Sequence, residues 1–344
     1  MKAAIMGEAR QLSIQEIPAP QPDGENVIIK VTHCGICGSD LGMWSHGTRK
    51  GQVLGHEFSG IVYDPGCMAG KLKAGDRVTY IPGEPCGECY VCRIGHSNLC
   101  MTNSFLADPS KPNLNGAYSE YYVAKRPDYV RKLPDHVSFE EGAMAEPLAV
   151  ALRAIHRSGI QLGDKVLVNG AGFIGQLCVT LAKKAGASYV AVAEVNENRG
   201  RAAMKFGDAD VFVDAKLPDA AERMKQAAGG LFDVVIDCTG AGPAIAAGMQ
   251  VLRPVGHFLF VGTNPRTIDF AFMTPFIMKE ITATGVLGYT AEEFDTALDM
   301  MDKKLIDTKK YITGELPLDR LQTAFETLTD PTKEDVKLII RIPG

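Results

Sequence analysis

A glycine-rich turn between an apolar strand and a helix, near the middle of the chain, constrains the fold most. The turn Gly170–Gly175 has the pattern G-x-G-x-x-G and directly follows the strand candidate Lys165–Asn169. Apolar residues then recur at helical spacing, and a second strand candidate, Tyr189–Glu194, comes next. Further strand candidates alternate with helical stretches, at 211–213, 233–237, 258–261 and 281–284. This alternation predicts an α/β domain built on a doubly wound parallel sheet.

The residues of this turn have separate expected roles in binding a dinucleotide. Gly170 permits the tight turn, Gly172 lets a pyrophosphate approach the backbone, and Gly175 lets the helix pack closely on the strand. Phe173 and Ile174 complete the turn at the helix N-terminus, which faces the phosphates. The alternative is a structural βαβ turn that binds no nucleotide.

An acidic residue ends the second strand of this unit. Glu194 lies 19 residues beyond Gly175, where a carboxylate can accept hydrogen bonds from the adenosine ribose and repel a 2′-phosphate. The cofactor is therefore expected to be NAD rather than NADP, although Arg199 nearby weakens this preference. The alternative is an incidental surface glutamate.

Four cysteines with the spacing C-x2-C-x2-C-x7-C predict a structural zinc site. They lie close enough in the chain to surround one tetrahedral ion: Cys86, Cys89, Cys92 and Cys100. The chain has nine cysteines, an odd number that complete disulfide pairing cannot accommodate. Free thiols on a surface loop are the alternative.

A second set of potential ligands is spread along the chain. Cys37, His56 and Glu146 offer a thiolate, an imidazole and a carboxylate, which can hold zinc and leave one position open. Each has a structural alternative. Cys37 could form a redox pair with Cys34, His56 could be an ordinary hydrogen-bonded histidine, and Glu146 could favour a helix N-terminus.

Length, charge and hydropathy limit the class of protein. A chain of 344 residues can form two domains, and its formal charge of −5 provides no basic surface for nucleic acid or for a membrane. The start of the sequence has no signal-peptide pattern, and no apolar run approaches the length of a membrane span. We therefore expect a cytoplasmic protein that acts on small molecules.

Several motifs together resemble those of the zinc-dependent medium-chain alcohol dehydrogenases, over essentially the full length. Besides the four-cysteine segment and the glycine turn, they are Cys34–Asp40, Gly55–Gly60, Ala74–Val78 and Glu146–Val150. The glutamate at position 146 resembles the sorbitol, butanediol and sugar-alcohol dehydrogenase branch, where classical members have a cysteine.

The resemblance implies a role for each residue of the predicted catalytic site. Cys37 and His56 correspond to ligands of the catalytic zinc, and Glu57 and Glu146 to carboxylates that bind it directly, through water, or alternately. Asp40 corresponds to a carboxylate that orients His56, although it could simply start a helix.

The resemblance also implies how the proton and the hydride are handled. Ser39 takes the proton of the substrate hydroxyl, and the hydride passes to C4 of the nicotinamide. Backbone near Val261 and Leu287 would receive the nicotinamide carboxamide; plain strand-end packing is the alternative.

The chain departs from its relatives in two places. Gly42 stands where many relatives have a histidine of the proton relay, and His46 could substitute or could be a plain surface residue. The long loop Ala107–Asn115 could shape the substrate entrance or could be an inert insertion.

The implied architecture is a GroES-like β domain with a Rossmann domain inserted. Residues 1–148 and 288–344 would form the former, with the zinc lobe at 86–100, and residues 149–287 the latter. We expect reversible oxidation of a secondary alcohol, namely a polyol, diol or sugar alcohol that is free or phosphorylated, to a ketone with NAD. The expected metal content is two zinc ions per chain, and the expected assembly is a homo-oligomer, a tetramer before a dimer.

Four alternatives stay open at this stage. The first is a dehydrogenase of a bulky hydrophobic alcohol such as a hydroxysteroid, and the second is a zinc-free quinone or enone reductase. The third is a catalytically silent sensor of nucleotide and zinc. The fourth is a zinc-ribbon nucleic-acid binder, which the acidic net charge opposes.

Overall fold

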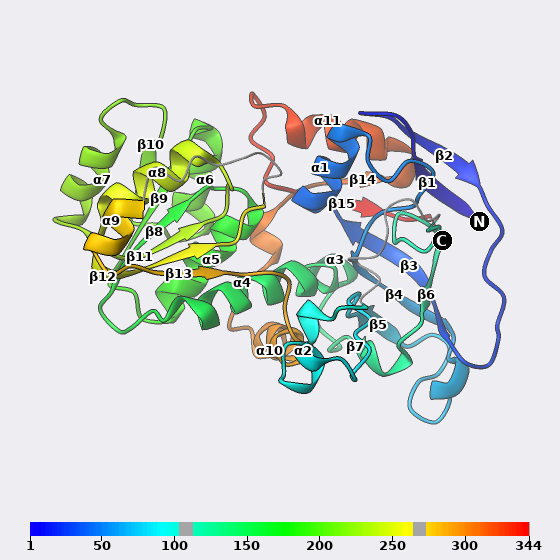
Figure 1. The fold of residues 1–344 in the computed structure, drawn as a ribbon. Coiled ribbons are helices and arrows are strands. Elements are labelled where there is room, and N and C mark those ends of the chain that lie inside the picture. Colours follow the sequence, from blue (N-terminus) through cyan, green and yellow to red (C-terminus); the bar gives the residue numbers. More distant parts are fainter. Residues whose placement is uncertain (103–112, 264–272, 344) are drawn as a thin grey trace. The chain divides into compact units, whose positions relative to one another are not determined.

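The computed structural model describes residues 1–102, 113–263 and 273–343, and most of the loop predicted at 107–115 lies outside these ranges (Figure 1). The chain divides into two compact units. Unit 1 comprises Met1–Ala149, Thr290–Pro331 and Lys337–Gly344, and unit 2 comprises Val150–Tyr289 and Thr332–Val336. Among the described residues, no helix is long and apolar enough to cross a membrane.

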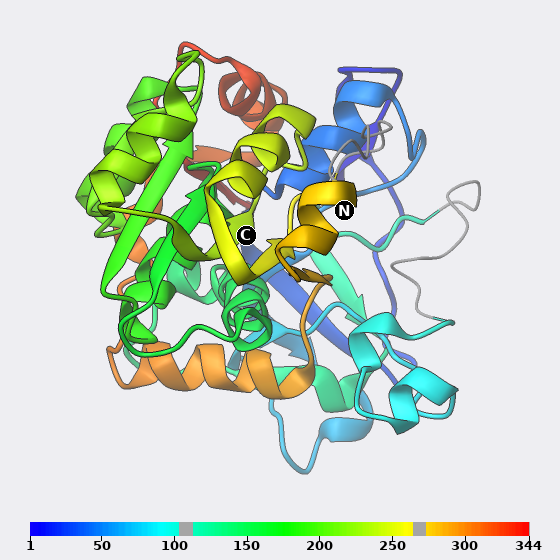
Figure 2. The same ribbon diagram turned by 60° about the vertical axis from the view of Figure 1, so that its left-hand side comes forward.

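Unit 2 contains a parallel sheet with helices packed against it (Figures 1 and 2). In the described residues its strand order is β10-β9-β8-β11-β12-β13, which is the dinucleotide-binding order 3-2-1-4-5-6 in chain sequence. The strands are β8 (Lys165–Asn169), β9 (Tyr189–Glu194), β10 (Val211–Asp214), β11 (Phe232–Asp237), β12 (Leu252–Phe260) and β13 (Thr282–Gly285). The helices are α5 (Phe173–Lys184), α6 (Glu197–Phe206), α7 (Ala220–Ala228), α8 (Gly242–Val251) and α9 (Met273–Met278). The predicted doubly wound sheet is confirmed.

The central strands of this sheet are apolar on both faces. β8 is buried along four of its five residues, as the continuous run Val-Leu-Val predicts for a strand covered on both sides. The helix after it, α5, buries nearly its whole length, including Leu177 and Leu181. The sheet therefore holds the glycine turn at the carboxyl end of a rigid strand.

Unit 1 is built on a mostly antiparallel sheet, in which β14 and β15, from the last part of the chain, pair in parallel. Its order in the described residues is β14-β15-β3-β4-β5-β7, with β6 also paired to β3, beside a small β1–β2 sheet. The strands are β1 (Lys2–Met6), β2 (Leu12–Glu16), β3 (Val27–Gly35), β4 (Glu57–Asp64), β5 (Arg77–Tyr80), β6 (Tyr121–Ala124), β7 (Val130–Lys132), β14 (Ile312–Pro317) and β15 (Lys337–Arg341). This arrangement agrees with the predicted GroES-like β domain.

Unit 1 also contains helices. They are α1 (Gly38–His46), α2 (Tyr90–Arg93), α3 (Phe139–Gly142), α10 (Ala291–Asp302) and α11 (Leu321–Thr329). A further helix, α4 (Ala145–Ser158), begins in unit 1, and its residues from Val150 onward belong to unit 2. α10 starts at a capping box of Thr290 and Glu293, and it buries Phe294 and Met301 as their helical spacing predicts.

Candidate functional site

Cys37 lies at the N-cap of α1, directly after strand β3. Its extended backbone (φ −87°, ψ 150°) leaves the thiol facing the first turn of the helix, where Ser39 donates to it from both its backbone and its hydroxyl. The two donor–sulfur distances are 3.5 Å for the Ser39 nitrogen and 3.2 Å for its Oγ. The sulfur of Cys37 therefore lies at the helix N-terminus, and a deprotonated cysteine is the form that binds metal.

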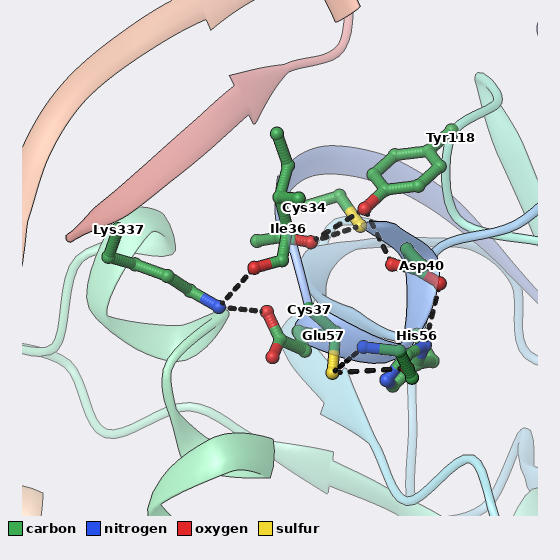
Figure 3. Close-up of polar contacts among 10 residues, drawn as sticks. Cys34, Ile36, Cys37, Asp40, His56, Glu57, Tyr118 and Lys337 are labelled. Atoms are coloured by element: carbon green, nitrogen blue, oxygen red, sulfur yellow. Dashed lines mark hydrogen bonds and ion pairs between the residues drawn. The ribbon is translucent and has the colours of Figure 1, made fainter. Parts of the chain in front are cut away.

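The neighbouring strand brings two more ligands to the same place. Glu57 is the first residue of β4, His56 precedes it, and Glu57 pairs in register with Gly35 of β3. The ligand atoms of Cys37, His56 and Glu57 all lie within 4.8 Å of one another, and Figure 3 shows the three side chains converging. The structure therefore brings together three of the four predicted catalytic-site ligands.

Negative charge gathers around His56. Burial alone would lower the pKa of this imidazole, but Asp40, Cys37 and Glu146 act more strongly and hold the pKa well above its usual value. Oδ1 of the buried Asp40 lies 3.6 Å from Nδ1 of His56. That oxygen has no hydrogen-bond partner among the described residues. A cation among these groups would balance the charge, so the donor set fits a metal ion.

Asp40 is itself held by a second side chain. The hydroxyl of the buried Tyr118 donates to Asp40 Oδ2 at 2.7 Å and contacts the carbonyl of Gly35 at 3.1 Å (Figure 3). Tyr118 therefore directs one carboxylate oxygen away from His56 and leaves the other facing it. Tyr118 lies outside the sequence motifs, and its link to Asp40 was not predicted.

Glu57 has a buried partner that sequence reasoning missed. Nζ of Lys337, on β15, forms an ion pair with Glu57 and donates to the carbonyl of Ile36 at 2.9 Å (Figure 3). Lys337 and Glu57 are each only 1% exposed. A lysine in the apolar final strand was the available signal, because a lysine is almost never fully buried unless it is paired.

Glu146 occupies a different position from the other predicted ligands. It is buried in the first turn of α4, and its charge raises the pKa of His56. Among the described residues it is not part of the group whose ligand atoms lie within 4.8 Å. The structure thus places Glu57, rather than Glu146, in direct reach of Cys37 and His56.

The predicted proton-relay substitute lies away from Ser39. His46 is at the exposed end of α1, where its Nδ1 hydrogen-bonds the carbonyl of Gly42 at 2.8 Å. It is separated from Ser39 by seven residues of helix, or about 10 Å of rise. In this conformation His46 is out of hydrogen-bonding reach of Ser39.

The four cysteines form a compact lobe around α2, drawn in cyan in Figure 2. All four sulfur atoms lie within 4.8 Å of one another, and those of Cys86 and Cys100 are 3.5 Å apart. A hydrogen bond from Thr102, with backbone donors at Cys89 and Glu88, lowers the pKa of Cys86 to about 6. Burial and the neighbouring sulfurs raise the pKa of Cys92 to about 12. Four thiolates at this spacing repel one another, so the arrangement fits a bound cation.

The glycine turn of unit 2 has the geometry that its sequence predicts. Gly170 adopts a positive φ of 92°, and Gly172 is the N-cap of α5. A Cβ at Gly175 would lie 1.9 Å from the Gly170 carbonyl oxygen, so any side chain there would separate the helix from the strand. Phe173 and Ile174 form the first turn of α5.

The acidic residue after β9 is tied directly to this turn. The amide of Ala171 donates to Glu194 Oε2 at 2.7 Å, and the amides of Val195 and Asn196 donate to Oε1 at 2.7 and 2.9 Å. These donors fix the carboxylate at the carboxyl edge of the sheet beside the glycine turn. Arg199 lies in the first turn of α6 and is half-buried.

The remaining predicted cofactor contacts follow the last two strands of this sheet. Val261 comes directly after β12, and its amide donates to the carbonyl of Asp237 at 2.9 Å. Leu287 follows β13 and is 38% exposed. Both residues lie beyond strand carboxyl ends, the edge at which such sheets bind ligands.

Comparisons with known proteins cover the whole chain. Residues 23–135 match the alcohol dehydrogenase GroES-like domain, and residues 174–303 match the zinc-binding dehydrogenase model. The chain is 35% identical over 333 residues to a probable D-xylulose reductase A from Aspergillus clavatus, covering 94% of this chain and 92% of that protein.

Solved structures extend this similarity to the fold. The crystal structure of 2R,3R-butanediol dehydrogenase from Bacillus subtilis gives a TM-score of 0.86 at 30% identity, over 100% of this chain and 99% of that one. L-idonate 5-dehydrogenase from Escherichia coli gives 0.87 at 27% identity, over 99% and 97%. The chain therefore belongs to the zinc-binding, medium-chain alcohol dehydrogenase family, as its sequence motifs predict.

Proposed function

We propose that this enzyme reversibly oxidises a secondary alcohol of a polyol, diol or sugar alcohol to a ketone, with NAD as the hydride acceptor. The observation that carries the proposal is the convergence of Cys37, His56 and Glu57 at the N-terminus of α1. The relatives that act on D-xylulose, 2R,3R-butanediol and L-idonate support a polyhydroxylated or vicinal substrate.

The donor set indicates how this chain would hold the catalytic zinc. Cys37 and His56 supply sulfur and nitrogen, and the charge of Glu57 is already balanced by Lys337. We infer that Cys37, His56 and Glu57 would hold the ion and that Glu146, whose charge acts on His56, would bind it through water or alternately with Glu57. Zinc bound here would act as a Lewis acid that lowers the pKa of a substrate hydroxyl.

The protein's own groups then position and move the proton. Ser39 Oγ lies 3.2 Å from Cys37 Sγ, so it borders the candidate metal site and can accept the hydroxyl proton. Asp40 orients His56 through Nδ1, and Tyr118 fixes Asp40. Because His46 is remote from Ser39, we propose that the proton leaves Ser39 through water or substrate hydroxyls.

The nucleotide-binding edge of unit 2 supports NAD as the cofactor. Glu194 is fixed beside the glycine turn, where a carboxylate favours ribose hydroxyls and repels a 2′-phosphate. Arg199 on α6 would soften this preference. Backbone at Val261 and Leu287 remains our proposed contact for the nicotinamide carboxamide.

The test is NADH or NADPH formation with a panel of alcohols. The panel contains xylitol, 2R,3R-butanediol, L-idonate, a sugar-alcohol phosphate and a hydroxysteroid, each with NAD and NADP, before and after chelation and zinc restoration. Chelator-sensitive NADH formation with a polyol or diol supports the proposal. Turnover of the hydroxysteroid alone would instead establish a bulky hydrophobic substrate, and silence with both zinc sites filled would favour a sensor.

Three further expectations accompany this function. We propose two zinc ions per chain, a cytoplasmic homo-oligomer with a tetramer favoured over a dimer, and domain boundaries at 1–148 with 288–344 and at 149–287. Metal analysis and sedimentation of the purified protein measure the first two directly.

A further inference from the structure

Unit 1 contains another group of potential metal ligands, separate from the two described above. His33 lies on β3, Glu140 on α3 and Glu315 on β14. His33 Nε2 is 3.8 Å from Glu140 Oε1 and 4.0 Å from Glu315 Oε1, and all three ligand atoms lie within 4.8 Å of one another. None of these residues is part of the proposed catalytic or four-cysteine sites.

The sheet register explains why these distant residues meet. β15 lies between β3 and β14, with Arg341 opposite His33 on one side and Ile339 opposite Glu315 on the other. Residues two apart on a strand point to the same face, so His33 and Glu315 share one face of the sheet. Glu140 reaches that face from α3.

The imidazole of His33 is held by ring stacking. Its side chain is 12% exposed, and its ring stacks on Phe139 with centroids 6.3 Å apart and planes 13° apart. Among the described residues, Nδ1 has no hydrogen-bond partner, and Nε2 is too far from either carboxylate to donate to it. Nε2 therefore lies near two carboxylate oxygens without a direct hydrogen bond to either, which leaves its lone pair available to a metal ion.

The protonation states suit a metal ligand. Burial lowers the pKa of His33 in spite of the two nearby carboxylates, so the ring is neutral near pH 7 and has a lone pair to offer. Burial raises the pKa of Glu140. Hydrogen bonds from Ser138 and from the backbone of Glu140, together with the charges of His33 and Lys309, outweigh burial and hold this pKa below its usual value.

The spacing also suits a small divalent ion. Tetrahedral ligands at about 2.0–2.2 Å from zinc are roughly 3.3–3.6 Å apart, so His33 Nε2 needs to approach the two carboxylate oxygens by only a fraction of an ångström. We propose that His33, Glu140 and Glu315 form an additional binding site for a divalent first-row transition-metal ion, with zinc as the preferred occupant.

Charge and exposure predict how such a site would behave. The two carboxylates balance the charge of a divalent ion. Arg341 Nε donates to Glu315 Oε1 at 3.0 Å, so Arg341 offsets part of the repulsion between the carboxylates when the ion is absent. The Glu315 side chain is 37% exposed, so the ion would keep water ligands and exchange with solvent. Its expected role is to join α3 to the sheet, because the ligands come from three separate segments.

The test uses Mn2+ as a selective probe on the full-length enzyme loaded with two zinc ions per chain, so that the catalytic and four-cysteine sites are filled and the additional site is available. Mn2+ suits carboxylate and imidazole ligands and competes poorly for thiolate sites, so it reports this site by electron paramagnetic resonance. We expect one bound Mn2+ per chain, displaced by added Zn2+. H33Q, E140Q and E315Q should each weaken Mn2+ binding by roughly tenfold or more.

A matched control separates the site from general loss of charge. Glu197, like Glu315, forms an ion pair with an arginine, Arg201, on the protein surface, so E197Q should bind Mn2+ like the wild type. Added Zn2+ should also raise the unfolding temperature of the wild type and of E197Q but not of E315Q. Absence of bound Mn2+ in the wild type, or binding that survives all three variants, would overturn the proposal whatever the dehydrogenase assay gives.

Discussion

Replacing Lys337 by methionine tests whether the buried ion pair with Glu57 holds unit 1 together. Methionine keeps an unbranched apolar side chain of nearly the same length and lacks the ammonium group. Both partners are 1% exposed, so the variant leaves a carboxylate buried without its counter-charge and the Ile36 carbonyl without its donor. Removing one partner of such a pair costs about 3–5 kcal/mol, and the lost carbonyl bond is already included in that range.

Urea unfolding of the zinc-loaded protein measures this loss in the relevant unit. The chain's single tryptophan, Trp44, is fully buried in unit 1, so its fluorescence follows that unit. The double variant K337M/E57Q removes both charges and should unfold at higher urea than K337M alone, because no unpaired charge remains. K303M breaks the exposed pair of Lys303 with Asp299 and should leave the midpoint near that of the wild type. A loss below about 1 kcal/mol in K337M, or a double variant weaker than the single one, would refute the reasoning.

The remaining predictions concern the zinc lobe, the cofactor and pH. C89S should lower bound zinc by one ion per chain and lower the unfolding temperature. Turnover per folded active site that still contains zinc should stay the same. Metal analysis that shows loss from the catalytic site instead would contradict the structural role of the four-cysteine site. E194A should shift the ratio of kcat/KM for NAD over NADP towards NADP by roughly tenfold or more, because a hydrogen bond to a carboxylate contributes about 1.5–3 kcal/mol. An unchanged ratio would show that Glu194 does not contact the cofactor. Burial lowers the pKa of His257, whose Nε2 lies 2.8 Å from Thr284 Oγ1. Its contribution to stability is therefore present above the ordinary pKa of 6.5 and is lost as the pH falls through the lowered value, so H257Q should flatten the acid side of the stability–pH curve.

The parallel sheet could be predicted because the residues that specify its strands and helices follow one another closely in the sequence. The run Lys165–Asn169 is apolar without alternation, and the glycine turn and helix follow it at once, which fits a strand covered on both faces. The final strand, β15, also has a local signal, the apolar run Leu338–Ile340. The neighbours of β15 have no such signal, because pairing between β15 and β3 joins residues about 300 positions apart, and no local pattern encodes that register.

The candidate metal centre was predictable to the extent that each ligand lies in a recognisable motif. Cys37 and Ser39 share one helix N-terminus, and His56 and Glu57 are adjacent in the chain, so the structure joins only two segments there. His33 shows the opposite case. Its partners come from α3 and β14, and only the strand register brings the three together.

Glu57 shows why a sequence motif alone does not identify the residues that bind a metal ion. The same carboxylate lies within ligand distance of Cys37 and His56 and in an ion pair with Lys337, which is 280 residues away in sequence. A metal ion and an ammonium group compete for that carboxylate, and the loss of either leaves a charge unbalanced in a buried site. The ion pair with Lys337 would therefore oppose the binding of a metal ion by Glu57. The adjacent residues His56 and Glu57 can be recognised in the sequence as potential metal ligands. The pairing of Glu57 with Lys337 depends on the register of β15 and cannot be recognised there.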